Sequence, residues 1–160
     1  MPQLYGRNEV RRQQQRVRTV FDLVDGKGLD SEVEAHFARY LCIRLAGFAE
    51  QSLKDLVSAH AKAQASPEVH RYVEAKVNLV WGINRTKLKE TLDSLNPTWM
   101  EQLETSMTQE LDTLHSVGKT RDNVSHGGDT GVTLITVIRY REDVFKLVNR
   151  LVSFLDPDPT

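Results

Sequence analysis

Residues 31–63, SEVEAHFARYLCIRLAGFAEQSLKDLVSAHAKA, decide the fold of this chain. Apolar residues recur along this stretch at intervals of three and four, as they do on one face of an α-helix. Asp30 or Ser31 can cap its start, and at 1.5 Å per residue the helix would be about 50 Å long. A helix of that length predicts the spine of a helical bundle. The face that we expect to be buried contains Phe37, Leu41, Leu45, Phe48, Ser52 and Leu56.

The helical pattern continues on both sides of this spine. A shorter apolar stripe covers residues 7–24, and further stripes follow at breaks made by glycine, proline or asparagine. Residues 132–138 are β-branched, but no second strand is available to pair with them, so we assign them to the last helix. We therefore predict an all-α fold: one domain over residues 1–155 with five to seven helices, and a disordered tail over residues 156–160. The later helices are expected to start at Ser66-Pro67, Asn84, Asn96-Pro97, about Met107, and between Thr133 and Thr136.

The composition is typical of a globular domain. Apolar residues make up 39% and charged residues 27% of the 160 residues, and no apolar run approaches the roughly 20 residues of a membrane helix. The net charge of −1 argues against bulk attraction to nucleic acid but allows a local basic groove. The first twenty residues lack the features of a secretory signal. The single cysteine, Cys42, cannot form an intrachain disulfide, so we expect a buried thiol in a reducing cytoplasm.

Residues 121–127, RDNVSHG, have the most chemical content. Arg121 and His126 are five positions apart, or about 140° around a helix, so they converge only where the helix ends near His126. The glycines at positions 127 and 128 favour such an end. A guanidinium grips phosphate oxygens and an imidazole transfers protons near neutral pH, so the pair suits phosphodiester chemistry. On spacing alone, the alternative is an ordinary helix terminus at the surface.

Other candidate residues have both a functional and a structural interpretation. Arg11, Arg12, Arg16 and Arg18 lie on the first helix and can grip RNA phosphates, or they form a solvated face paired with nearby acids, which we favour. Trp81 and Trp99 can stack on bases, but at helix junctions we expect packing anchors.

Two further patterns argue against bound cofactors. Gly118-Lys119-Thr120 lacks the first glycine of a phosphate loop, so we expect no nucleotide there. The five histidines form no cluster with metal-ligand spacing, so we expect neither a metal nor another cofactor. These histidines are His36, His60, His70, His115 and His126.

The segment 121–127 resembles the signature of the HEPN superfamily. In that signature an Arg is followed by Asn, Asp or His, and a His comes after four to six residues. Arg121, Asp122 and His126 fill these three places. Residues 40–52, and His126-Gly127 with the following residues 131–134 and the amphipathic last helix, are also similar to the subgroup labelled RiboL-PSP-HEPN or MAE-like HEPN. The resemblance covers roughly residues 30–155.

The resemblance implies an α-helical bundle that forms a homodimer, with two motifs facing each other across a cleft. It implies a metal-independent ribonuclease of toxin–antitoxin or antiphage defence, which cleaves RNA by attack of the 2′-hydroxyl. Arg121 and His126 would be catalytic, Asp122 would support them, and Glu50 would be an acid that orients the arginine. An antitoxin or a defence-system protein would be a partner.

Two alternatives to a nuclease stay open. A HEPN module without catalysis would bind RNA or a partner protein, and a helical adaptor would have no connection with RNA. From its apolar surroundings, Glu50 is either a partly buried acid paired with an arginine or an exposed helix residue. Some toxins of the family continue His-x-Tyr, with a tyrosine that an antitoxin modifies, whereas Gly128 stands at that position here.

Overall fold

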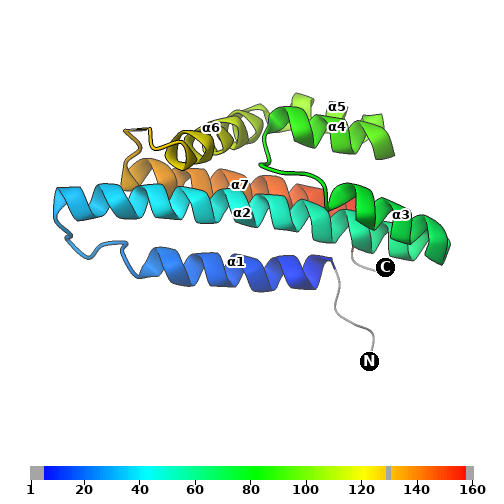
Figure 1. Cartoon of the computed structure of the whole chain (residues 1–160), viewed down its shortest axis with the longest axis horizontal. Helices are drawn as coiled ribbons and strands as arrows, with labels where there is room; N and C mark the ends of the chain where they lie inside the picture. The colour runs from blue at the N-terminus through cyan, green and yellow to red at the C-terminus, as the bar shows by residue number, and fades with distance from the viewer. Residues whose placement is uncertain (1–5, 129–130, 158–160) are drawn as a thin grey trace.

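The computed structural model describes residues 6–128 and 131–157, and within them all the regular structure is helical. The long helix α2 (Ser31–Gln64) lies beside α7 (Leu134–Leu155) along the middle of the molecule (Figure 1). Helix α1 (Arg7–Asp22) lies on one side of this pair and α6 (Thr108–Ser125) on the other. Helices α3 (Pro67–Val77), α4 (Arg85–Leu95) and α5 (Pro97–Ser106) complete the bundle. The predicted all-α bundle is confirmed, with seven helices among the described residues.

The helix starts follow the capping residues of the sequence. Asp30 accepts a hydrogen bond of 2.9 Å from the backbone N–H of Glu32, and so caps α2. Side chains cap four other helices in the same way, namely Ser66 for α3, Asn84 for α4, Asn96 for α5 and Thr133 for α7. These local signals explain why the predicted boundaries agree closely with the observed ones.

The predicted core face of α2 is buried for most of its length. Leu41, Leu45 and Leu56 are fully enclosed, and Phe48 and Ser52 are buried. Phe37 is only half-buried, because the first turns of α2 extend past the start of α7 (Figure 1).

Two contacts fix α6 in the bundle. The buried carboxylate of Asp143 on α7 accepts a hydrogen bond of 2.7 Å from the Thr113 hydroxyl and a second bond from the amide of Gln109, both on α6. On another face of α6, a Cβ placed on Gly118 would lie 2.7 Å from the carbonyl oxygen of Ile83. Gly118 therefore serves the close approach of the α3–α4 loop to α6, and this explains the glycine that resembled part of a phosphate loop.

The start of the predicted tail has partners. Arg7 donates through its backbone N–H to Asp156 at 2.9 Å, and through its guanidinium to the carbonyl of Pro157 at 2.8 Å. Residues 158–160, the rest of the expected tail, lie outside the described residues. In the described part of the chain, no helix is both long and apolar enough to cross a bilayer.

Candidate functional site at the end of helix α6

Helix α6 ends at the predicted motif in a Schellman arrangement. The N–H of Gly128 donates to the carbonyl of Asn123 at 2.8 Å, and the N–H of Gly127 donates to the carbonyl of Val124 at 3.0 Å. Gly127 has a φ of 76°, a left-handed conformation that glycine adopts without strain. His126 is the C-cap residue. The predicted helix end at His126 is therefore confirmed.

The two motif side chains have different surroundings. His126 is exposed, and in the described parts of the chain its imidazole has no hydrogen-bond or ion-pair partner. The Arg121 side chain is 31% exposed, and its Nη1 lies 3.3 Å from Oδ1 of Asp122. No hydrogen bond between described residues joins Arg121 to His126. Asp122 thus contacts the arginine directly, and the imidazole is available to a ligand.

Arg121 lies against the α3–α4 loop at Gly82. A Cβ placed on Gly82 would be 2.6 Å from Nη1 of Arg121, and Gly82 has a φ of 68°. Both the left-handed backbone and the close guanidinium require a residue without a side chain at this position. The loop therefore helps to set where the arginine lies.

Glu50 belongs to the same cluster, but no hydrogen bond or ion pair between described residues joins it to Arg121. Its Oε1 accepts a short hydrogen bond from the N–H of Gly82, and its Oε2 lies 3.8 Å from Nζ of Lys54. The Glu50 side chain is partly buried, at 21% exposed, but its ion-pair partner among the described residues is Lys54 rather than an arginine. The carboxylate instead holds the loop against which Arg121 lies.

Sequence reasoning missed the rest of this cluster. Nζ of Lys87 donates to the carbonyl of Trp81, and Nζ of Lys54 lies 5.9 Å from the centroid of the Trp81 ring. Trp81 as a residue is 72% exposed, so its interpretation as a packing anchor is wrong. Lys54 lies on α2, Lys87 lies on α4, and Trp81 lies in the α3–α4 loop. The only signal in the sequence near these residues was the Trp-Gly break between two expected helices.

Trp99, in contrast, is the packing anchor that we expected. Its ring stacks on that of Phe154 at 5.7 Å and meets the edge of the His60 ring at 5.5 Å. The ring is half-buried against the core. The two tryptophans therefore have different roles.

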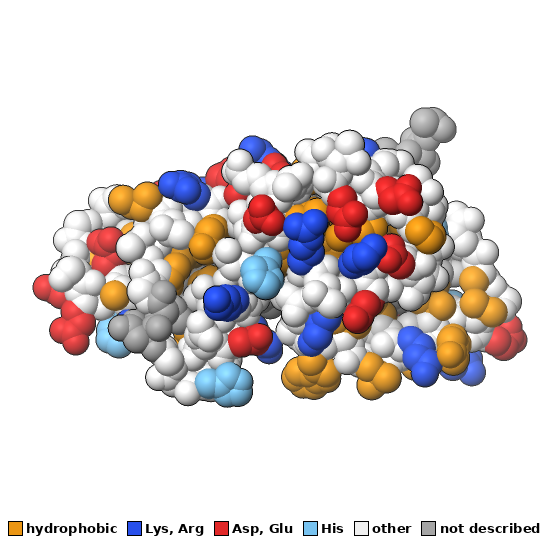
Figure 2. Space-filling model, turned by 90° about the horizontal axis from the view of Figure 1, so that it is seen from above, with side chains coloured by type: hydrophobic (Ala, Val, Ile, Leu, Met, Phe, Trp, Pro, Cys, Tyr) orange, Lys and Arg blue, Asp and Glu red, His pale blue; other side chains and the backbone are white. Residues whose placement is uncertain are grey.

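A hollow of about 510 Å³ adjoins the end of α6. Arg39 and Tyr40 on α2 stand on one side of it, and the two glycines after His126 stand on the other. Figure 2 shows that basic and acidic side chains alternate over the face of the molecule that includes α6, rather than forming one uniformly basic surface. The residues around the hollow are His36, Arg39, Tyr40, Ile43, Val124, Gly127 and Gly128.

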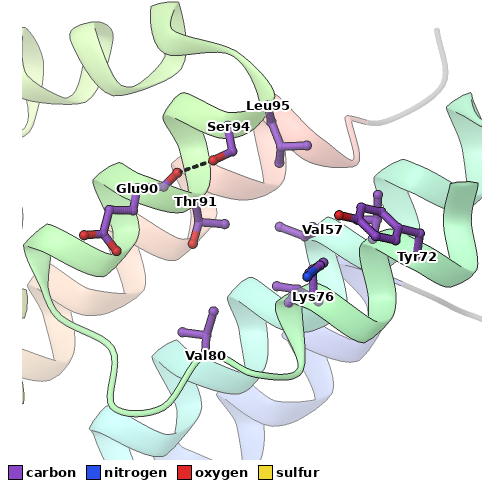
Figure 3. A pocket seen from close by; sticks show the side chains of 10 residues that line it. Val57, Tyr72, Lys76, Val80, Glu90, Thr91, Ser94 and Leu95 are labelled. Atoms are coloured by element: carbon purple, nitrogen blue, oxygen red, sulfur yellow. Dashed lines mark hydrogen bonds between the residues drawn. The ribbon is translucent and has the colours of Figure 1, made fainter.

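A second hollow, of about 450 Å³, lies between α3 and α4 over α2. Figure 3 shows Tyr72 and Val80 on one wall, Thr91 and Leu95 on the other, and Val57 at the floor. Its lining is mostly apolar and includes neither Arg121 nor His126. We call it the α3–α4 groove.

The arginines of α1 lie apart from the motif. Arg11, Arg12, Arg16 and Arg18 are exposed on a helix that packs on the side of α2 and α7 opposite to α6 (Figure 1). Arg12 pairs with Glu9 at 2.7 Å, and the guanidinium of Arg18 lies 4.9 Å from the centroid of the Phe145 ring. The structure does not bring these side chains to the α6 site. The Glu9 pair agrees with the solvated face that we favoured.

The single cysteine lies in the core. Cys42 is fully buried as expected, and its burial raises the pKa of the thiol to about 11. Among the described residues, no group of three or more His, Cys, Asp or Glu side chains is arranged to hold a metal ion.

The helical bundle and the Arg-x4-His motif at a capped helix end define the HEPN class of proteins. The family model described as RiboL-PSP-HEPN matches residues 8–156. The chain belongs to this family of the HEPN superfamily. Neither a curated protein nor a solved structure matches the chain.

Proposed function

We propose that this protein is a metal-independent endoribonuclease of the toxin or antiphage-defence type. The observation that carries the proposal is the arrangement at the end of α6 in a chain of the HEPN class. There, an exposed imidazole without a partner in the described chain follows an arginine packed against a glycine. The arginine is held in place, and the imidazole has no partner among the described residues, so the two groups can position a phosphate and transfer a proton.

The proposed reaction uses the RNA itself as nucleophile. The 2′-oxygen loses its proton and attacks the adjacent phosphorus, the bond from phosphorus to the 5′-oxygen breaks, and that oxygen takes up a proton. The products are a 2′,3′-cyclic phosphate and a 5′-hydroxyl. His126 transfers protons, and Arg121 stabilises the extra negative charge on the phosphorane. No water has to be activated, so the reaction needs no metal.

A homodimer supplies what one chain lacks in this scheme. The reaction needs a base at the 2′-oxygen and an acid at the 5′-oxygen, and each protomer offers one imidazole at its motif. Two protomers related by a twofold axis would bring two copies of Arg121 and His126 to one cleft. An antitoxin or another defence-system protein would act by covering this cleft in the cytoplasm.

The test is cleavage of end-labelled RNA by the purified protein in the presence of EDTA. We expect His126→Ala and Arg121→Ala each to lower the rate at least 100-fold while the circular dichroism spectrum is unchanged. His115→Ala is the matched control, because His115 is another exposed histidine of α6. Cleavage by the His126→Ala protein at the rate of the His115→Ala protein would contradict the proposal.

The second candidate is a HEPN module that binds RNA without cutting it. It is favoured by the contacts of Arg121 with Asp122 and Gly82, which are also those of an arginine with a structural role. The same assay separates the two functions. A binding module retains labelled RNA in a salt-dependent way and leaves it intact.

A further inference from the structure

Trp81 combines an exposed ring with a backbone that is held on both sides. Its carbonyl accepts a hydrogen bond from Lys87, and the next residue, Gly82, donates its N–H to Glu50. One residue further on, the carbonyl of Ile83 packs against Gly118 of α6. The backbone of the loop is therefore held in place, although Trp81 itself is 72% exposed. A ligand that stacks on the ring would meet a surface whose backbone is already ordered.

Three cations lie at Trp81 and at the glycine that follows it. Nζ of Lys54 lies 5.9 Å from the ring centroid, Nζ of Lys87 reaches the Trp81 carbonyl, and Nη1 of Arg121 lies against Gly82. The acids in contact with these groups are Glu50 and Asp122. Three cations and two carboxylates leave a local charge of +1, in a chain whose net charge is −1. We call Lys54, Trp81, Lys87 and Arg121 the Trp81 patch.

An exposed indole with cations around it is the arrangement that binds single-stranded nucleic acid. The face of an unpaired base stacks on the ring, and the cations contact the phosphates on either side. The bases of a double helix keep their faces stacked on one another, so a duplex offers no such partner. The patch also includes the arginine to which we assign the scissile phosphate.

We propose that Trp81 stacks on an unpaired base next to the phosphate held by Arg121, that Lys87 contacts a neighbouring phosphate, and that Lys54, whose side chain is only 14% exposed, supports the ring from beneath. This inference rests on the proposed function, because it takes RNA as the ligand. It adds a specificity-determining contact outside the Arg-x4-His motif.

The test measures binding rather than cleavage, with His126→Ala protein and a fluorescent single-stranded RNA oligonucleotide. We expect Trp81→Ala in this background to weaken binding by about 5- to 150-fold, the range for one base–aromatic stack. Trp81→Phe keeps a ring and should restore most of the affinity. RNA should quench the tryptophan fluorescence of the parent, and this quenching should be lost in Trp81→Phe.

The structure offers a matched control at Tyr72. Its ring is 64% exposed and lies 5.4 Å from Nζ of Lys76, so it is also an aromatic–lysine pair, but it stands on the wall of the α3–α4 groove (Figure 3). Tyr72→Ala should bind RNA as the parent does. An RNA duplex of the same sequence should bind more weakly than the single strand, and equally to the parent and to Trp81→Ala.

An oligonucleotide with abasic sugars separates stacking from a structural effect. The penalty of Trp81→Ala should disappear on this probe, because no base is left to stack. An equal penalty on both probes would overturn the inference, and so would unchanged binding by Trp81→Ala. If Trp81→Ala no longer forms a dimer in light scattering but binds RNA with unchanged affinity, the ring forms a contact between protomers and the inference is overturned. If the proposed nuclease function is wrong, the parent protein leaves the RNA intact in the cleavage assay. The effect of Trp81→Ala on RNA binding would then be unchanged.

Discussion

Gly82→Ala tests whether the α3–α4 loop positions Arg121, the arginine that we propose to be catalytic. The new Cβ would lie 2.6 Å from Nη1 of Arg121, whereas an ordinary contact begins at about 3.4 Å. The guanidinium is the flexible end of a long side chain, so it moves and the backbone stays. The guanidinium must therefore move by at least 0.8 Å, the difference between 3.4 Å and 2.6 Å, to relieve the clash.

The two consequences of this change have different sizes. An alanine at a φ of 68° costs about 1–2 kcal/mol of folding stability, because its Cβ crowds the following carbonyl. A misplacement of about 1 Å at a positioning group can cost about 100-fold in rate. We therefore expect a modest fall in the unfolding temperature and a cleavage rate lower by one to two orders of magnitude.

Gly26→Ala is the control for strain alone. Gly26 has a φ of 69°, and a Cβ there meets no other atom within 4 Å. It should lose similar stability and keep the full rate of RNA cleavage. Thermal unfolding and single-turnover cleavage of labelled RNA measure the two effects separately. If Gly82→Ala cleaves RNA as fast as Gly26→Ala, the loop does not position Arg121 and the reasoning is refuted.

Three more predictions concern Glu50, Gly118 and Cys42. Glu50→Ala should lower the unfolding temperature and the cleavage rate more than Glu50→Gln, because glutamine can still accept the N–H of Gly82; equal effects would contradict this role. Gly118→Ala should destabilise the protein by about 1–3 kcal/mol in urea unfolding, despite the better helix propensity of alanine, because its Cβ meets a backbone oxygen; a stabilised variant would show that the close approach is wrong. The buried Cys42 thiol, with its pKa raised by burial from 9.0 to about 11, should stay protonated in the folded protein while the unfolded chain ionises. Stability from this thiol is thus complete below pH 9 and falls by about 1.4 kcal/mol per pH unit towards pH 11, and the pH dependence of Cys42→Ala should be shallower by this contribution.

Local signals were sufficient for most of the fold. The spine helix, its capping residue Asp30 and the stop after His126 each depend on residues within a few positions of one another. Phe37 is less buried than its periodicity predicted, because periodicity identifies a face of a helix but not how far the neighbouring helices extend along it. Burial at the ends of a long helix is a tertiary property.

The α6 site was predictable only in its contiguous part. The sequence pattern identified Arg121, Asp122 and His126, which lie on one helix end. It did not indicate that the carboxylate of Glu50 binds a loop N–H, or that the Trp81 ring is left exposed. Both features depend on the contact between α2 and the α3–α4 loop. The spacing between residues 50 and 82 in the sequence does not predict that contact.

The α3–α4 loop is the element on which the site depends most. Within three residues it contacts α4 through the Trp81 carbonyl, α2 through the Gly82 N–H, and α6 through both Gly82 and Ile83. A displacement of this short segment would therefore move the guanidinium of Arg121 and the exposed indole together. In the proposed enzyme, the phosphate that is cut and the base that is recognised would then be kept in register by one loop. In that enzyme the motif on α6 would supply the reacting groups, and the loop would determine where the RNA lies against them.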